Sequence, residues 1–280
     1  MFQTIVSAKN LKDSLSSEGL VVIDCRFQLA DSDAGRQAYK AGHIPGAQYA
    51  HLDDDLSSPM TVTSGRHPLP QIDCFERTLQ AWGVNSGSQV VCYDDMGGAF
   101  AARLWWMLNW LGHTKVAVLD GGIQAWERAG FAFQQDVVVP SQGNFSARAD
   151  DSRHVDLGFV EDAIKNGKIR LTDARTQARF TAEDNTTDPV AGHVPGAVSL
   201  PFAANLAADK TFLPADELQE RLESALASDG SETVAMCGSG VTACHNILAA
   251  QIAGLPLPRL YVGSWSEWIR NPKRPVATGL

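Results

Sequence analysis

The sequence of this chain repeats once, and this repeat constrains the possible folds more than any other feature. Four blocks recur in the same order: an apolar run ending in Asp-x-Arg (20–26 and 169–175), GHIPGA or GHVPGA (42–47 and 192–197), a second apolar run (from 90 and from 233) and a closing Gly/Trp block (118–130 and 260–272). The copies are offset by about 142–150 residues, far more than the period of a solenoid repeat. The sequence therefore predicts a duplicated domain.

Short apolar runs alternate with amphipathic stretches in each half, for example at 74–84 and 104–112. Buried strands alternating with helices indicate a parallel sheet covered on both faces. The predicted fold class is α/β, with two similar doubly wound domains. We place the first domain at 1–138 and the second at 155–280, joined by a linker over 139–154 that carries Pro, Gly, Ser and charge without helical periodicity.

The composition indicates a globular intracellular protein. Hydrophobic residues make up 44% and charged residues 20% of the 280-residue chain, and no run approaches the roughly 18 apolar residues of a membrane helix. The start of the chain lacks a basic segment followed by an apolar run, so no secretory signal is visible and we expect a cytoplasmic location. A net charge of −9 argues against nucleic acid as a partner.

Five cysteines occur, at 25, 74, 92, 237 and 244, with irregular spacing and no CxxC pair. This pattern suggests neither a disulfide framework nor a structural zinc site. We expect no metal and no organic cofactor.

Cys237 follows the apolar run ETVAM at 232–236 and precedes a helical pattern. Ligands in open α/β sheets bind beyond the carboxyl ends of strands. Gly238 and Gly240 allow the loop to curl so that backbone amides form a concave anion site, which would lower the thiol pKa from about 8.5 and favour a reactive thiolate. The competing interpretation is a cysteine simply packed at a strand end. Asp94 takes the corresponding place in the first half, so that half is expected to be catalytically silent.

These motifs resemble those of the tandem rhodanese sulfurtransferases over nearly the whole chain. The resemblance rests on the repeated GH(I/V)PGA, the Asp-x-Arg strand ends, the CGSGVTAC loop and the GSWSEW block. The CGSGVT loop is similar to that of the 3-mercaptopyruvate branch. Thiosulfate-preferring members typically carry two basic residues after the cysteine, where this chain has Gly238 and Ser239.

The resemblance implies a sulfur transfer in which Cys237 carries a persulfide. It implies that Arg179 binds the substrate carboxylate, and that Ser239, His67 and Asp53 form a proton relay. The loop that would contact the substrate consists of Gly238, Ser239, Gly240, Val241 and Thr242. The implied acceptor is cyanide, a small thiol or a thioredoxin-like protein. A second arginine of the family pattern is replaced here by Asp188. His43 and His193 recur in both halves, which favours a structural role.

Three alternatives remain open at this point. A phosphatase needs a Cys-x5-Arg loop, but Ala243 stands six residues after Cys237. A non-catalytic binding module is disfavoured by the intact cysteine loop. Thiosulfate could be the better sulfur donor, because loop sequence predicts donor preference less well than it predicts chemistry.

Overall fold

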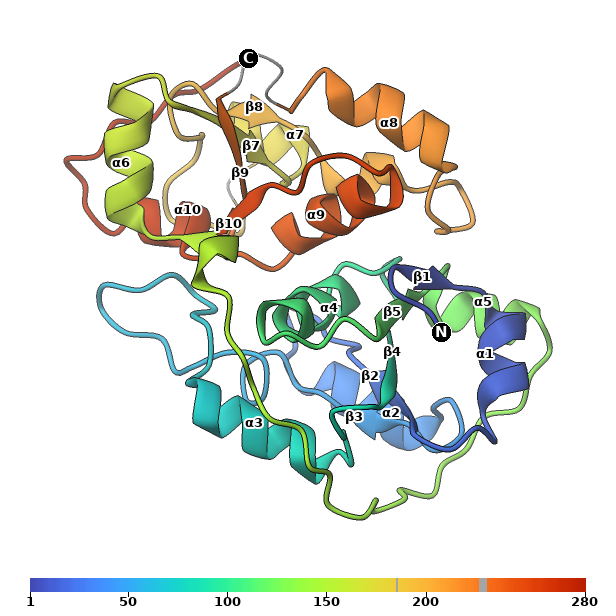
Figure 1. Ribbon diagram of the computed structural model, residues 1–280. Helices are drawn as coiled ribbons and strands as arrows, with labels where there is room; N and C mark the ends of the chain where they lie inside the picture. Colours follow the sequence, from blue (N-terminus) through green and yellow to red (C-terminus); the bar gives the residue numbers. More distant parts are fainter. Residues whose placement is uncertain (185, 227–230) are drawn as a thin grey trace. The chain divides into compact units, whose positions relative to one another are not determined.

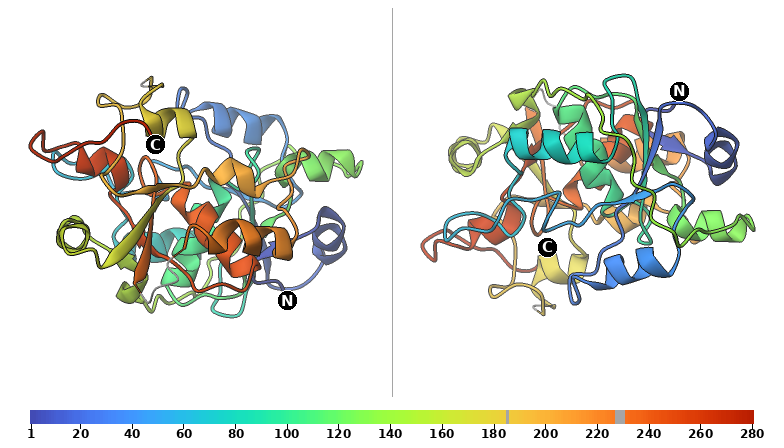
Figure 2. Two further views of the ribbon diagram at one scale, coloured as in Figure 1. Left: turned by 90° about the horizontal axis from the view of Figure 1, so that it is seen from above. Right: turned by 90° about the horizontal axis from the view of Figure 1, so that it is seen from below.

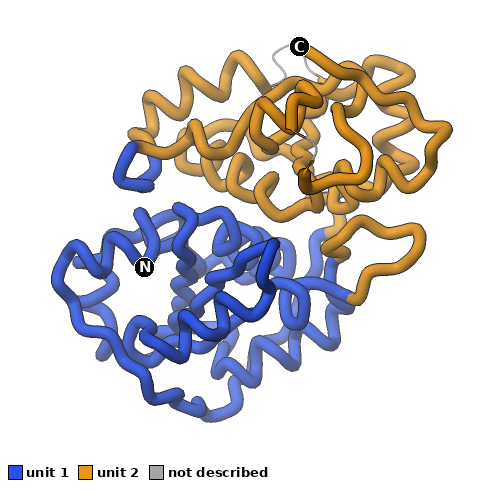
Figure 3. Tube along the Cα trace, turned by 180° about the vertical axis from the view of Figure 1, so that it is seen from behind, with its two compact units in different colours: residues 1–58, 69–150, 208–212 blue, residues 59–68, 151–207, 213–280 orange. Residues whose placement is uncertain are grey.

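The computed structural model describes residues 1–184, 186–226 and 231–280. Its contacts divide the chain into two compact units (Figure 3), which are unit 1 (1–58, 69–150 and 208–212) and unit 2 (59–68, 151–207 and 213–280). Segment 59–68 therefore packs within unit 2 although it lies in the first half of the sequence.

Among the described residues, each unit contains one five-stranded sheet whose pairings are all parallel (Figure 1). The strand order is β1-β5-β4-β2-β3 in unit 1 and β6-β10-β9-β7-β8 in unit 2. The strands of unit 1 are β1 (Ile5–Val6), β2 (Leu20–Asp24), β3 (Gln48–Tyr49), β4 (Gln89–Tyr93) and β5 (Val116–Leu119). Those of unit 2 are β6 (His154–Val155), β7 (Ile169–Asp173), β8 (Val198–Ser199), β9 (Glu232–Met236) and β10 (Arg259–Tyr261). The predicted α/β class with two similar domains is confirmed.

Helices lie on both sides of each sheet (Figure 2). Unit 1 carries α1 (Ala8–Ser14), α2 (Ala34–Ala41), α3 (Ile72–Ala81), α4 (Ala101–Trp110) and α5 (Gly122–Arg128). Unit 2 carries α6 (Leu157–Lys165), α7 (Gln177–Thr181), α8 (Ala215–Glu223), α9 (Ala243–Ile252) and α10 (Ser264–Trp268), with short 3₁₀ turns at Asp151–Arg153 and Phe202–Asn205. The first helix of each unit has a side-chain cap at its start, from Ser7 and Asp156 respectively.

The central strands are buried on both faces, as the apolar runs predict. Val91 and Tyr93 of β4 belong to a core cluster with Leu11 and Trp126, from α1 and α5. Val90, one residue along the strand, is also fully buried. Side chains alternate between the faces of a strand, so both faces of β4 are covered. No helix in the described part of the chain is long and apolar enough to cross a membrane.

The register of unit 2 brings two of the sequence motifs to the same edge of its sheet. Asp173 at the end of β7 pairs with Met236 at the end of β9. Arg175 and Cys237 each follow shortly after these residues. Both motifs therefore emerge at the carboxyl edge, where ligands bind in open α/β sheets.

Candidate active site

The Asp-x-Arg motifs hold the backbone of the GH(I/V)PGA loops. In unit 1, Arg26 Nη2 lies 2.6 Å from Asp24 Oδ2 and donates to the carbonyl of Gly42 at 2.8 Å. The pair is buried, and a planar guanidinium can serve the carboxylate and the carbonyl at once. Unit 2 repeats the arrangement, with distances of 2.7 and 2.8 Å, through Asp173, Arg175 and Gly192.

The histidines of these loops also make the same contacts in both units. His43 Nδ1 lies 2.8 Å from the carbonyl of Tyr39 and its ring stacks on the Tyr39 ring at 4.0 Å. His193 Nδ1 lies 2.8 Å from the carbonyl of Phe180 and stacks on that ring at 3.7 Å. These matching contacts support the structural role expected for both histidines.

Cys237 lies at the strand-to-helix junction that the sequence predicts. It follows directly on β9, and α9 begins at Ala243. Gly240 between them has φ +77°, a left-handed conformation that favours glycine. The backbone amide of Cys237 donates to Ser264 Oγ at 3.1 Å, which fixes the end of the strand against the closing block. Cys237 is 2% exposed, so its thiol is almost fully buried at this junction.

In unit 1, the loop at the corresponding strand-to-helix junction binds a carboxylate through its backbone amides. Asp94 follows directly on β4, as Cys237 follows on β9, and its carboxylate accepts hydrogen bonds from four backbone amides. Met96 and Gly98 donate to Oδ1, each at 2.8 Å, and Phe100 and Ala101 donate to Oδ2 at 2.7 and 2.8 Å. The loop is thus a cradle of amides around an anion, which in unit 1 is the protein's own carboxylate.

The two loops share a left-handed glycine at the same place. Gly97, three residues after Asp94, has φ +68°, close to the +77° of Gly240 three residues after Cys237. Cys237 therefore occupies the position in the loop of unit 2 that Asp94 occupies in the loop of unit 1. This equivalence supports a site suited to a negatively charged sulfur.

Ser239 and His67 lie in contact. The distance from His67 Nδ1 to Ser239 Oγ is 2.7 Å, and both residues are buried. His67 is thus not an exposed, solvated loop residue but is buried in unit 2. Either atom can donate, because the donor role of the imidazole nitrogen depends on its tautomer.

Asp53, the third residue of the implied relay, belongs to unit 1. Its backbone amide and that of Asp54 each donate to His51 Nδ1 at 3.2 Å. Burial raises the pKa of the Asp53 carboxyl, with the nearby His51 opposing this shift. The assignment of Asp53 to the relay stays a prediction.

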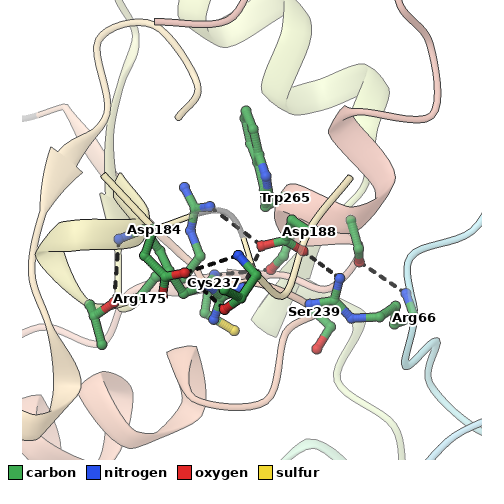
Figure 4. A network of polar contacts seen from close by, with 12 residues as sticks. Arg66, Arg175, Asp184, Asp188, Cys237, Ser239 and Trp265 are labelled. Atoms are coloured by element: carbon green, nitrogen blue, oxygen red, sulfur yellow. Dashed lines mark hydrogen bonds and ion pairs between the residues drawn. The ribbon is translucent and has the colours of Figure 1, made fainter. Parts of the chain in front are cut away.

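Arg179 on α7 and Asp188 form part of a network that includes a residue the sequence did not indicate. Arg66 Nη1 lies 2.5 Å from Asp188 Oδ1 (Figure 4). Arg179 Nη2 lies 2.5 Å from Asp188 Oδ2. Burial raises the pKa of Asp188, but the hydrogen bonds from Arg179 and Arg66 outweigh burial and hold that pKa below its usual value. Arg175 Nη1 is also 3.8 Å from this carboxylate.

Both guanidinium groups flank the cysteine loop. Arg66 Nη2 and Arg179 Nη2 each lie 2.9 Å from the position that a Cβ on Gly238 would occupy. A side chain at 238 would therefore require both guanidinium groups to shift. Sequence reasoning missed Arg66, although its place directly before His67 in GRHPLP was the available signal.

The other four cysteines occupy different environments. Cys25 and Cys92 are buried in unit 1, and burial raises the pKa of both thiols. Cys244 is buried on α9, where its sulfur lies 3.4 Å from the carbonyl of Gly240, and Cys74 is exposed on α3. Within the described residues no group of three metal-binding side chains is present.

Both the fold and the cysteine loop are those of the rhodanese-like domain, and the model of that domain matches residues 7–129 and 157–271. The chain belongs to the rhodanese family, as its motifs predict. It is 48% identical over 278 residues to a Pseudomonas aeruginosa protein named "Probable 3-mercaptopyruvate sulfurtransferase", covering 98% of each chain. It is also 32% identical over 280 residues to the thiosulfate sulfurtransferase of Gallus gallus, covering 96% of this chain and 94% of the other.

A solved structure extends this likeness to three dimensions. The 3-mercaptopyruvate sulfurtransferase from Leishmania major superposes with a TM-score of 0.85 at 33% identity, covering 96% of this chain and 76% of that one.

Proposed function

We propose that this chain is an enzyme that moves sulfane sulfur from 3-mercaptopyruvate to a thiol or cyanide, through a persulfide on Cys237, and releases pyruvate. The observation that carries the proposal is the loop of Cys237, where two guanidinium groups lie beside Gly238 and Ser239 contacts His67 at 2.7 Å. A cationic group for a carboxylate and a candidate proton carrier thus adjoin one thiol. The relatives' names point to the same chemistry.

In the proposed first half-reaction the Cys237 thiolate attacks the sulfur of the donor. A new S–S bond forms while the donor's C–S bond breaks, and its electron pair stays on carbon as the enolate of pyruvate. Arg179 and the loop of Gly238, Ser239, Gly240, Val241 and Thr242 hold the donor. The Ser239–His67 pair, with Asp53 as its proposed third member, supplies the proton that the enolate needs.

In the second half-reaction the outer sulfur of the persulfide passes to an acceptor. The nucleophile takes this sulfur and Cys237 leaves as a thiolate, ready for another donor. We propose cyanide, a small thiol or a thioredoxin-like dithiol protein as the acceptor. A cytoplasmic location would suit this cycle, because thiols stay reduced there.

Mass spectrometry tests the carrier. Incubating the protein with 3-mercaptopyruvate and no acceptor should add one sulfur, about 32 Da, to the peptide that contains Cys237. Cys237→Ser should abolish both this adduct and turnover, whereas Cys74→Ser, which removes an exposed thiol, should retain both. An unmodified Cys237 peptide in a folded protein would contradict the proposal.

Side-by-side values of kcat/KM for 3-mercaptopyruvate and thiosulfate test the donor. Thiosulfate stays a specific alternative, because the Gallus gallus relative is a thiosulfate sulfurtransferase. The neutral residues Gly238 and Ser239 favour the carboxylate donor over a dianion. A tenfold advantage for thiosulfate would overturn the donor assignment and leave the persulfide chemistry intact.

A further inference from the structure

Asp188 lies between the cationic side chains of Arg66 and Arg179, beside the cysteine loop. Its negative charge therefore contributes to the net charge that a sulfur donor would meet there. Its two carboxylate oxygens each contact a different arginine, Arg66 and Arg179, at 2.5 Å. The three groups Arg66, Arg179 and Asp188 together carry a net charge of +1, and the Asp184 carboxylate also interacts with Arg179. Arg175 adds nothing to this balance, because it is paired with the buried Asp173.

No other charge lies on the cysteine loop itself. Residues 238–242 read GSGVT, so the donor meets no formal charge from them. The Arg66 and Arg179 side chains are 26% and 17% exposed, whereas that of Asp188 is 4% exposed. Both arginine side chains are thus partly accessible to solvent, whereas the Asp188 carboxylate is buried. Arg179 Nε is buried and has no hydrogen-bond partner among the described residues.

We propose that Asp188 makes the Arg66–Arg179 pair selective for a sulfur donor that carries one negative charge. This inference rests on the proposed sulfur transfer and extends it to a rule for donor choice. Arg66 becomes a second anion-binding residue, in place of the arginine that the family pattern has at position 188. Asp188 sets the charge of the pair and does not itself bind the donor.

The physical reason is that the energy of interaction scales with the product of the charges. 3-Mercaptopyruvate has one carboxylate, which a net charge of +1 neutralises. Thiosulfate is a dianion and would leave an excess negative charge in a partly buried site, which is unfavourable. Raising the net charge of the pair helps the dianion about twice as much as the monoanion, and lowering it harms the dianion more.

Two substitutions that change this charge in opposite directions provide the test. Asp188→Asn raises the net charge to +2, and Arg66→Gln lowers it to zero. The measured quantity is the ratio of kcat/KM for 3-mercaptopyruvate to kcat/KM for thiosulfate. We expect this ratio to fall about tenfold or more in Asp188→Asn. In Arg66→Gln both kcat/KM values should fall, but the ratio should rise at least about threefold.

Glu183→Gln is the matched control, because Glu183 is an exposed residue of the same segment and its substitution removes one negative charge. Its donor ratio should stay within about twofold of the wild-type ratio. General damage to the site would shift the ratio in the same direction in both test variants, so opposite shifts identify a charge effect.

Ratios that are unchanged, or that move in the same direction, would overturn the inference. If Asp188→Asn does not fold, as judged by circular dichroism, Arg66→Gln decides alone, because the Arg66 side chain is a quarter exposed and should tolerate substitution. Failure of the proposed function is a separate result: the wild-type protein would then form no persulfide on Cys237 with either donor.

Discussion

Asp188 contributes to stability as well as to the charge of the site, and its contribution to stability depends on pH. Its folded-state pKa is lowered, because hydrogen bonds from Arg179 and Arg66 outweigh burial. A carboxyl with a depressed folded pKa stabilises the native state above its unfolded pKa of about 4, and this contribution is lost as pH falls through the folded value.

We therefore expect Asp188→Asn to lower the free energy of unfolding by about 2 kcal/mol at neutral pH. The difference from wild type should stay constant above about pH 5 and shrink below about pH 4. Urea unfolding of both proteins across this range measures it. A difference that grows toward acid pH would show that Asp188 is not held as an anion in the folded protein.

Single residues differ in how far the sequence predicts their surroundings. Cys237 could be placed because an apolar run, two glycines and a helical pattern are all local signals. Ser239 and His67 could be paired only through the family resemblance. Arg66 was missed, because its place directly before His67 does not indicate its contact with Asp188, which spans 122 residues. The sequence showed that Asp188 replaces an arginine of the family pattern, but it did not show that Asp188 pairs with Arg66.

At the scale of elements, the strand–loop–helix junction occurs once in each unit, with a different residue directly after the strand. In unit 1 the junction after β4 contains its own anion, the Asp94 carboxylate, held by four amides. In unit 2 the same kind of junction after β9 presents a thiol. The sequence predicted that the first half lacks a sulfur carrier. The hydrogen bonds of Asp94 indicate that this residue instead holds the loop of unit 1 together.

Asp94→Ala should therefore destabilise the protein without removing the proposed carrier. The substitution leaves four backbone amides without their acceptor, and an unsatisfied buried donor costs about 1–3 kcal/mol. Because water can enter the space and bind some of the amides, we expect a total loss of about 2–4 kcal/mol.

Chemical denaturation provides the measurement for Asp94→Ala. Asp136→Ala, at an exposed position of the same unit, should change the free energy of unfolding by less than about 0.5 kcal/mol. Equal stability of the Asp94 and Asp136 variants would mean that the cradle does not depend on its anion.

At the scale of the whole molecule, the two units do not follow the two halves of the sequence. Segment 59–68 belongs to the first half but packs in unit 2. The Arg66 amide donates to Ser266 Oγ at 2.9 Å, and Arg270 Nε donates to the carbonyl of Ser64 at 3.1 Å. The duplication predicted two sheets correctly, but a repeat cannot reveal a segment that one copy contributes to the other.

Gly65 lies where this segment touches the backbone of unit 2. A Cβ at this position would collide with the carbonyl of Gly263, so Gly65→Val should displace the segment. Because Arg66 and His67 would move with it, we expect kcat/KM for 3-mercaptopyruvate to fall at least about tenfold while the circular dichroism spectrum is kept. Gly87→Val is the control, because no atom lies within 4 Å of the Cβ that it adds.

Limited proteolysis gives a second measure of the Gly65→Val variant. Cleavage within 59–68 should become faster, since a displaced loop is more accessible to protease. Wild-type activity together with wild-type cleavage would mean that the segment can be held without this close approach.

The position of segment 59–68 also bears on how such a gene can change over time. Residues 151–280 contain Cys237 but neither Arg66 nor His67. A truncation that removed the first half of the chain would therefore remove both of these side chains. A descendant reduced to one copy would have to evolve substitutes within that copy.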